Sequence, residues 1–298
     1  VVNKTMLSKR WRVGVDSGSG ATCIIVPKIL RELGAEVFTV NSQPDGTFPG
    51  RAPEPTSENL ADLCTLVRER KLDVGFAFDG DGDRFAVIDE TGRFAHQDSS
   101  LAAYASHEVC RRGGGSVVTH VDASMCIEEA VQRSGGKLLR TKVGDVAVSR
   151  TVKSTGSIFG GEPCGSWVHP DFNPAADGIL SAILFLRALE TEGVTPSQFV
   201  SKIPVYPILR SKVECEPLEK ESAMPLIKGR LLEAFHEMEE LSELDGIRVR
   251  LSSGWILVRP SGTEPAIRIT AEFRSSEETE EAMRKTLSIV KEIVGERR

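Results

Sequence analysis

The chain has 298 residues, 40% of them hydrophobic and 27% charged, which is the balance of a soluble protein with packed cores. This length favours two or three domains over one. A formal net charge of −6 argues against nucleic acid as a partner, because duplex binding rests on basic patches. The most apolar helix candidate, 178–189, is too short to cross a bilayer, so we expect no membrane partner. The six cysteines form no C-x-x-C pair, which suits free thiols in a reducing, cytoplasmic compartment.

Residues 1–112 predict a first α/β domain. A strand, a helix and a second strand follow one another near the start, and this βαβ pattern predicts a parallel sheet. A third strand runs into an acidic loop, and a fourth strand follows that loop directly. We expect strands at 12–16, 36–40, 74–78 and 85–88, and helices at 24–33, 57–70 and 99–112.

A run of three glycines, 113–115, predicts a domain border, and a second α/β series follows it up to residue 203. Pro204 and Pro207 then mark a linker, after which the pattern becomes α+β. The fold class that we expect is therefore α/β: two consecutive α/β domains with mixed sheets (1–112 and 113–203), followed by a smaller α+β C-terminal domain (204–298). The later elements are strands at 116–120, 137–140, 157–159, 247–251, 254–258 and 267–272, and helices at 125–134, 143–154, 176–190, 221–241 and 276–294.

An acidic loop between the third and fourth strands predicts a metal site. Asp79, Asp81 and Asp83 alternate with two glycines, and carboxylates crowded this closely repel one another unless a cation offsets them. Oxygen ligands of this kind favour Mg²⁺ or Ca²⁺ over zinc. Arg84, directly after the third acid, can hold an anion that the metal also touches. A solvated acidic turn is the alternative, although a turn does not need three acids.

An EF-hand calcium loop is the competing metal site for the same residues. Counting from Asp79, position 12 is Glu90, which fits, whereas position 6 should be glycine and is Arg84. The flanking sequences are typical of strands rather than helices. The pattern therefore favours a magnesium loop.

Two further loops carry polar groups between predicted elements. The sequence R-P-S-G-T-E-P, from Arg259 to Pro265, offers a guanidinium, hydroxyls and backbone N–H groups, which together can cradle a phosphate. An ordinary hairpin turn explains that loop equally well. The sequence G-E-P-C-G, from Gly161 to Gly165, places a carboxylate on a tight turn, and it is a weak signal by itself. Gly18 and Gly20 lack the third glycine of a dinucleotide-binding turn.

Taken together, the three loops resemble those of the α-D-phosphohexomutase family. The D-G-D-G-D-R motif, the G-E-x-S-G motif with cysteine in place of serine, and the R-P-S-G-T-E-P motif occur in the family's order and at about its spacing. Residues 44–49 and 121–124 also resemble family segments, and the likeness extends from about Trp11 to the end. It implies the second, third and fourth of the family's four domains.

The resemblance also implies roles for individual residues. The three aspartates would bind Mg²⁺ as the cofactor, and Arg84 would steady the phosphoserine phosphate as a catalytic residue. Lys142 matches a region that lines the sugar site, and it is our second catalytic candidate. The substrates would be sugar phosphates and a sugar bisphosphate. The groups that would hold them are Glu162 and Cys164 for the sugar hydroxyls, and Arg259, Ser261, Gly262 and Thr263 for the phosphate that is not transferred.

The family's nucleophilic serine lies in a T-A-S-H-N-P-like loop of its first domain, and Ser106–His107–Glu108 does not match that loop. Together with the start at Val1, this predicts a mutase without its serine domain; the alternative is a catalytically inactive sugar-phosphate-binding protein of the same fold. Cys164 and the following S-W-V-H sequence resemble archaeal members, which slightly favours glucosamine phosphate over glucose or mannose phosphate. Oligomeric state cannot be inferred from these residues.

Overall fold

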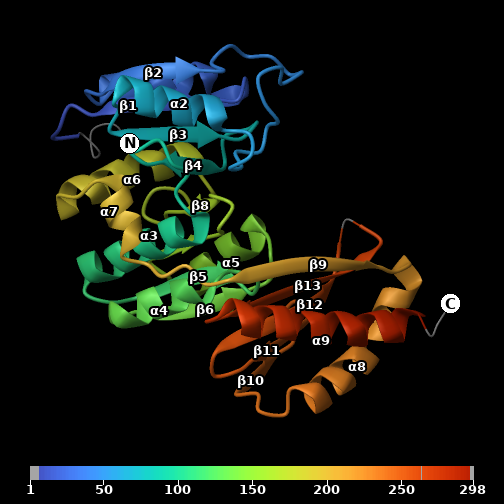
Figure 1. Cartoon of the computed structure of the whole chain (residues 1–298). Helices are drawn as coiled ribbons and strands as arrows, with labels where there is room; N and C mark the ends of the chain where they lie inside the picture. The colour runs from blue at the N-terminus through green and yellow to red at the C-terminus, as the bar shows by residue number, and fades with distance from the viewer. Residues whose placement is uncertain (1–6, 263, 296–298) are drawn as a thin grey trace. The chain divides into compact units, whose positions relative to one another are not determined.

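The computed structural model describes residues 7–262 and 264–295. The chain divides into two compact units, which we describe separately (Figure 1). Unit 1 comprises Val1–His120, Cys126–Arg140 and Gly144–Pro204. Unit 2 comprises Val121–Met125, Thr141–Val143 and Val205–Arg298.

The first sheet of unit 1 has the order β2-β1-β3-β4. Strand β1 pairs in parallel with β2 and β3, as the βαβ pattern predicted, and β3 pairs with β4 in an antiparallel hairpin that encloses the acidic loop. Strand β3 is buried at every position, as expected of a strand covered on both faces. The elements are β1 (Arg12–Asp16), α1 (Ile25–Glu32), β2 (Glu36–Val40), α2 (Ala61–Arg70), β3 (Val74–Phe78) and β4 (Phe85–Ile88).

The second sheet has the order β6-β5-β7-β8, again parallel at β5 and β7 with an antiparallel edge strand β8. Both sheets are therefore mixed, and the expected fold class is confirmed. Sequence analysis did not predict the short strand β8 or helix α7. The elements are α3 (Gln97–Arg112), β5 (Ser116–His120), α4 (Met125–Arg133), β6 (Lys137–Thr141), α5 (Asp145–Thr155), β7 (Phe159–Gly161), β8 (Trp167–Val168), α6 (Gly178–Glu192) and α7 (Pro196–Ser201).

Aromatic side chains from both sheets meet inside unit 1. The rings of Phe85 on β4 and Trp167 on β8 lie 4.7 Å apart in an edge-to-face arrangement, and Phe185 of α6 packs against both. Such pairs add stability beyond the apolar area that they bury. This cluster explains why the two α/β segments form one compact unit. The division of the chain into three domains, at 112 and 203, stays a prediction.

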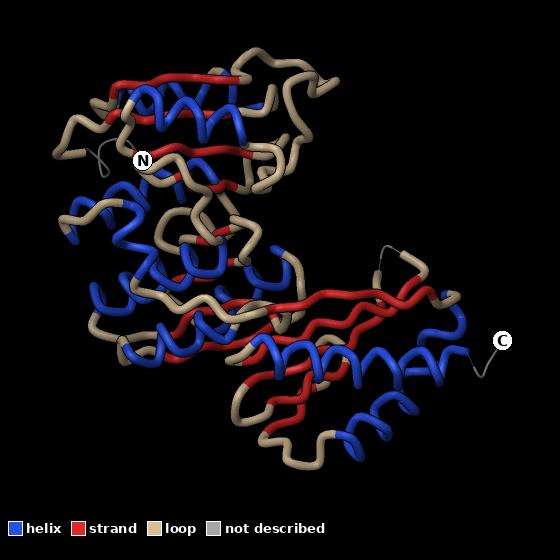
Figure 2. The backbone as a smooth tube through the Cα atoms, viewed as in Figure 1, coloured by secondary structure: helices blue, strands red, loops and turns tan. Residues whose placement is uncertain are grey.

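The sheet of unit 2 is antiparallel throughout, in the order β10-β11-β12-β13-β9. Its strands are the red segments of that unit in Figure 2. Alternate residues of β12 enter two different clusters: Ile256 and Val258 pack under α8 and α9, while Trp255 and Leu257 pack against Val121. Both faces are thus buried, and for this reason the short segments 121–125 and 141–143 belong to unit 2. Its elements are β9 (Ile208–Glu214), α8 (Pro217–Ala234), β10 (Glu240–Ser242), β11 (Ile247–Arg250), β12 (Gly254–Pro260), β13 (Ala266–Phe273) and α9 (Ser276–Gly295).

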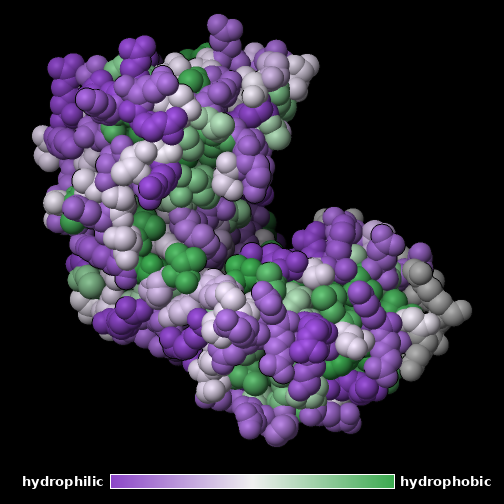
Figure 3. Space-filling model, in the orientation of Figure 1, coloured by the Kyte–Doolittle hydropathy of each residue, from purple (hydrophilic) through white to green (hydrophobic). Residues whose placement is uncertain are grey.

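The predicted helix 221–241 was wrong at its C-terminal end. Helix α8 ends at Ala234, Phe235 turns into the core, and Glu240–Ser242 instead forms edge strand β10 on β11. Backbone pairing at the edge of the sheet outweighs helix propensity there. Hydrophilic and hydrophobic side chains are interspersed over the visible face of each unit (Figure 3). Within the described residues, no helix is both long and apolar enough to span a membrane.

Candidate functional site

The acidic loop is a hairpin connection whose backbone folds around one carboxylate. Asp79 Oδ1 accepts hydrogen bonds from the backbone N–H of Gly82 at 2.9 Å and of Arg84 at 3.1 Å. Gly82 has φ +85°, a conformation that favours glycine. The loop therefore turns tightly enough for Asp79, Asp81 and Asp83 each to offer an oxygen, all within 4.8 Å of one another. Strands flank it on both sides, which excludes the EF-hand alternative.

The electrostatics of this loop suit a divalent cation. Burial raises the pKa of Asp79 from 3.8 to about 7, and the neighbouring carboxylates of Asp83 and Asp81 add to the increase. Asp83 Oδ1 is buried and has no hydrogen-bond partner among the described residues. A buried oxygen without a donor and a destabilised carboxylate charge are both relieved by a hard cation. The three aspartates therefore fit Mg²⁺, and their assignment as its ligands stays a prediction.

The Arg84 guanidinium is held over the acidic loop by a residue that sequence analysis missed. Arg84 Nη1 donates to both carboxylate oxygens of Glu54, at 2.9 and 2.7 Å. Its Nε lies 3.6 Å from Asp83 and 3.9 Å from Asp79, yet it is buried and donates no hydrogen bond to a described residue. This leaves a donor beside the acidic loop for an anionic ligand.

A buried ion pair contacts the acidic loop at its N-terminal end. Arg51 Nε donates to Asp16 Oδ1 at 3.0 Å, and Arg51 Nη2 donates to the carbonyl of Phe78, the residue before Asp79. Both side chains are almost fully buried, at 2% and 1% exposure. Because the partners are 35 positions apart, no local pattern could have revealed them.

The G-E-P-C-G loop is more buried than its sequence suggested, and its carboxylate is hydrogen-bonded. Glu162 is 6% exposed, and its Oε1 accepts a hydrogen bond from the Gly144 N–H at 2.8 Å. Burial raises the pKa of Glu162 above its ordinary value. Burial also raises the pKa of the Cys164 thiol to about 12, so the sulfur keeps its proton at neutral pH and serves as a weak donor. We predicted both as sugar ligands, and that assignment stays a prediction.

The structure brings the acidic loop and the G-E-P-C-G loop together. Arg84 and Ser166 form an isolated antiparallel bridge, and the Phe85 N–H donates to the Gly165 carbonyl at 3.3 Å. A Cβ on Gly165, which has φ +92°, would lie 1.9 Å from the Phe85 carbonyl oxygen. Only glycine allows this close approach. The candidate metal ligands and the candidate sugar ligands of unit 1 therefore lie on neighbouring loops that are joined by backbone contacts.

In unit 2, the R-P-S-G-T-E-P loop joins β12 and β13. Ser261 is 5% exposed, and its Oγ accepts a hydrogen bond from the Glu264 N–H at 3.2 Å. Lys220, which sequence analysis missed, is buried and donates to the Ser261 carbonyl at 2.9 Å and to the Glu264 carbonyl. Gly262 lies between them with open space around it. Thr263 lies outside the described residues.

Within unit 2, Asp245 lies near both Arg259 and the backbone of Val143, the residue after Lys142. Arg259 is only 13% exposed and lies 4.0 Å from Asp245 Oδ2, which also accepts a hydrogen bond from the Val143 N–H at 3.2 Å. Lys142, next to Val143, is exposed. Asp245 therefore connects the Arg259 side chain to the short segment that carries Lys142. The six cysteines are all free thiols, as expected.

Comparison with known proteins identifies the class to which this fold and these loops belong. Three family models match: phosphoglucomutase/phosphomannomutase α/β/α domain II over residues 2–92, α/β/α domain III over 96–206, and the C-terminal domain over 211–287. The chain belongs to the phosphoglucomutase/phosphomannomutase family, that is, to the phosphohexomutases.

Among its relatives are proteins named as phosphoglucosamine mutases. The chain is 45% identical to a probable phosphoglucosamine mutase of Methanopyrus kandleri, over 96% of this chain and 62% of that protein. It is 38% identical to the phosphoglucosamine mutase of Methanococcus maripaludis, over 98% of this chain and 66% of that protein. The resemblance to archaeal members is thereby confirmed. The chain spans about three fifths of the first relative's length.

Solved structures show the same fold. A phosphoglucomutase/phosphomannomutase family protein of Burkholderia thailandensis matches with a TM-score of 0.87 and 24% identity, covering 98% of this chain and 62% of that one. The N-acetylphosphoglucosamine mutase of Aspergillus fumigatus, solved with GlcNAc-6P and magnesium, matches with a TM-score of 0.67 and 16% identity, covering 98% and 64%.

Proposed function

We propose that this protein acts as a phosphoglucosamine mutase, an intramolecular phosphotransferase that interconverts glucosamine 1-phosphate and glucosamine 6-phosphate through a phosphoserine and a bisphosphate intermediate. The observation that carries the proposal is the backbone bridge between Arg84 and Ser166, which joins the candidate metal loop to the candidate sugar loop. The phosphoglucosamine mutase relatives support the choice of sugar.

Phosphoryl transfer depends more on positioning and charge neutralisation than on covalent work by the protein. In unit 1, Asp79, Asp81 and Asp83 would hold Mg²⁺, which when bound supplies positive charge against the transferred group. The Arg84 guanidinium, which Glu54 holds in place, would donate hydrogen bonds to the oxygens of the transferred phosphoryl group. These residues keep the phosphoryl group fixed while its charge redistributes.

The sugar and the other phosphate require further groups. The Glu162 carboxylate would accept hydrogen bonds from sugar hydroxyls, and the Cys164 thiol would donate one. In unit 2, Arg259, Ser261, Gly262 and Thr263 would bind the phosphate that is not transferred, and Lys142 would donate to the sugar phosphate. No segment of the 298-residue sequence matches the family's serine loop, so we assign no nucleophile.

Calorimetry with glucosamine 6-phosphate tests the binding half of the proposal. Arg259→Ala should weaken binding about ten- to a hundredfold, because charge-assisted contacts to phosphate are worth roughly 1.5–3 kcal/mol. Arg210→Ala, an exposed arginine of β9, is the matched control and should bind as the unaltered chain does. An Arg259→Ala protein that keeps its affinity would show that the loop is only a turn. Equal affinity for mannose 6-phosphate would remove the sugar assignment.

A coupled assay with Mg²⁺ and a sugar bisphosphate tests the catalytic half. These 298 residues by themselves should show no mutase turnover, since no segment of the sequence matches the serine loop that receives the phosphoryl group in the family. A supplied serine domain from a relative should restore turnover, and Asp81→Asn should abolish that turnover again. Turnover by the 298 residues alone, lost in Asp81→Asn, would contradict the proposed mechanism.

A further inference from the structure

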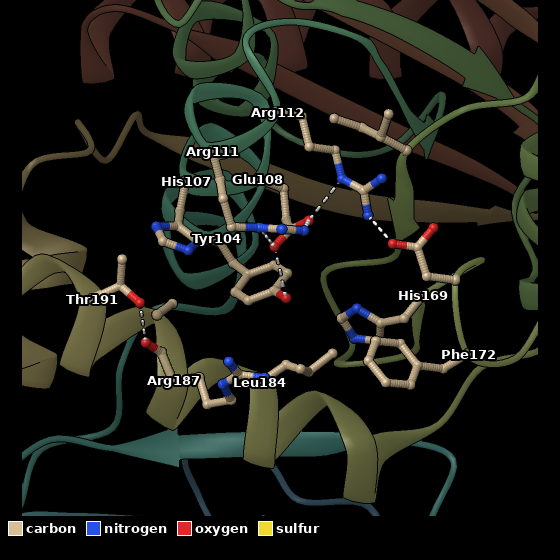
Figure 4. A pocket seen from close by; sticks show the side chains of 13 residues that line it. Tyr104, His107, Glu108, Arg111, Arg112, His169, Phe172, Leu184, Arg187 and Thr191 are labelled. Atoms are coloured by element: carbon tan, nitrogen blue, oxygen red, sulfur yellow. Dashed lines mark hydrogen bonds and ion pairs between the residues drawn. The ribbon is translucent and has the colours of Figure 1, made fainter. Parts of the chain in front are cut away.

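Unit 1 contains a pocket away from the candidate site, with a volume of about 290 Å³ (Figure 4). Two helices face each other across it. Helix α3 lines one side through positions from Tyr104 to Arg112, and α6 lines the other through positions from Leu184 to Thr191. The lining positions recur every three or four residues on each helix, so each helix presents one face to the pocket. None of the residues assigned to the mutase chemistry lines it.

The polar part of this pocket is dominated by guanidinium groups. The Glu108 carboxylate, 9% exposed, accepts hydrogen bonds from Arg111 Nε and Nη2 at 3.1 and 2.7 Å and from Arg112 Nε at 3.2 Å. Arg112 also pairs with Asp171, and α6 adds Arg187. Three arginines and two carboxylates thus line the pocket.

The guanidinium groups of Arg111 and Arg112 are held in position before any ligand binds. Because Glu108 engages both Arg111 and Arg112, little side-chain freedom remains to be lost when an anion arrives. Fixed donors of this kind suit a phosphate, which accepts hydrogen bonds through several oxygens. The sequence alone could not place Arg187 beside them, since it lies on a different helix.

The rest of the pocket is apolar or neutral. Leu184 of α6 and the ring of Phe172 line it, and Phe172 is 39% exposed, so part of its ring is open to a ligand. His169 is buried and hydrogen-bonds to Ser181 Oγ through Nε2 at 2.9 Å. Burial lowers the pKa of His169 to about 4, so the ring is neutral at pH 7. A ligand that fits has a phosphate at one end and a small apolar body at the other.

Helix α6 connects this pocket to the acidic loop. The helix begins at Gly178, whose N–H donates to the Gly82 carbonyl at 3.2 Å, and Asp177 caps it by accepting from the Leu180 N–H at 2.9 Å. A Cβ on Gly178 would lie 2.7 Å from the Arg84 carbonyl oxygen, so helix and loop are in close contact. One helix therefore both lines the pocket and contacts the loop that carries Asp79, Asp81 and Asp83.

We propose that the pocket between α3 and α6 binds a small organic phosphate, a phosphomonoester with an apolar body, and that its occupancy changes the affinity of the acidic loop for Mg²⁺ through α6. The binding step stands without the mutase assignment. Only the effect on Mg²⁺ rests on the proposed function.

Calorimetric titration of the 298-residue chain with phenyl phosphate tests the binding step. Arg187→Gln should weaken one binding event about ten- to a hundredfold, the range for losing a charge-assisted contact to phosphate. Arg133→Gln, an exposed arginine of α4, is the matched control and should leave that event unchanged. Arg259→Ala removes the candidate phosphate loop of unit 2, and the event should survive it. The proposal is overturned if Arg187→Gln binds normally, or if Arg259→Ala removes all binding.

Two further measurements separate the parts of the proposal. Phe172→Ala should weaken the binding of phenyl phosphate but not the binding of inorganic phosphate. Melting curves show whether the variants remain folded. Titration with Mg²⁺, with and without saturating phenyl phosphate, should show at least a twofold change in apparent affinity. Arg187→Gln should lose that change, which also controls for direct pairing of Mg²⁺ with the probe. Identical Mg²⁺ affinities overturn the coupling; absence of Mg²⁺ binding in every protein overturns the metal site and leaves the pocket standing.

Discussion

Asp79 gives the acidic loop a pH dependence that can be measured. Its carboxyl group has a pKa of about 7 in the metal-free fold, against 3.8 ordinarily, because it is buried beside two other acids. Between these two pH values the folded chain keeps a proton that the unfolded chain has lost. The metal-free protein should therefore lose stability as the pH rises from about 4 to about 7, and change little above that.

The size of this effect follows from the shift. About three pKa units at roughly 1.4 kcal/mol each set an upper limit of about 4 kcal/mol. Water reaches Asp81 and Asp83 beside it, so we expect about half, roughly 2 kcal/mol. Asp79→Asn should remove the penalty: its free energy of unfolding at pH 8 should exceed that of the unaltered chain by about 1–2 kcal/mol, while the two should agree near pH 4.

Metal binding should depend on pH in the opposite direction. Mg²⁺ needs the ionised carboxylate, so about one chain in eleven is competent at pH 6 and about ten in eleven at pH 8. The apparent affinity should rise about tenfold over that interval, and Asp79→Asn should bind weakly at both values.

Urea denaturation with a chelator at pH 4 and pH 8, and calorimetry with Mg²⁺ at pH 6 and pH 8, measure both effects. Asp62→Asn, an exposed aspartate of α2, is the matched control and should follow the unaltered chain. Parallel stability profiles for Asp79→Asn and the unaltered chain would refute the argument, as would a Mg²⁺ affinity that does not change with pH.

Three other variants test the supports of the loops. Glu54→Gln should cost only about 0.5–1 kcal/mol of unfolding free energy, less at high salt, because its pair with Arg84 is partly exposed; a salt-independent loss in urea denaturation would contradict this. Gly165→Ala should cost at least about 2 kcal/mol, since its Cβ would collide with the Phe85 carbonyl, and an unchanged melting temperature would show that the contact can relax. Lys220→Met should cost about 1–3 kcal/mol by leaving two carbonyls without their donor, and protease mapping should show the 259–265 loop opening first.

The acidic loop and the hairpin that holds it could be predicted because their signals are local. Three acids separated by glycines repel one another unless a cation offsets them, and the strands on either side follow from apolar runs. Glu162 gave only a weak signal, since its burial and its hydrogen bond from Gly144 depend on a residue 18 positions away. The predicted helix 221–241 failed at its end for a similar reason, because the partner of β10 lies further along the chain.

The supporting residues could not be predicted at all. Arg51 and Asp16 are 35 positions apart, and Glu54 and Arg84 are 30 positions apart, with no periodicity to connect them. Lys220 lies on a helix whose sequence gives no reason to expect contact with a loop 41 positions later. Such contacts arise only when the sheets bring distant segments together, and a single sequence does not show which segments meet.

The two candidate sites of unit 1 differ in how their polar groups are satisfied, and the difference indicates different roles. Around the acidic loop, Asp83 Oδ1, Arg84 Nε and Ser166 Oγ are buried without hydrogen-bond partners among the described residues, and the Asp79 charge is destabilised. A fold tolerates such groups where a ligand completes them, as expected of a site that does chemistry. In the α3–α6 pocket, Arg111 is already paired with a carboxylate. A ligand there adds to contacts that exist without it, so its binding should be weaker and readily reversed, which suits a regulatory site better than a catalytic one.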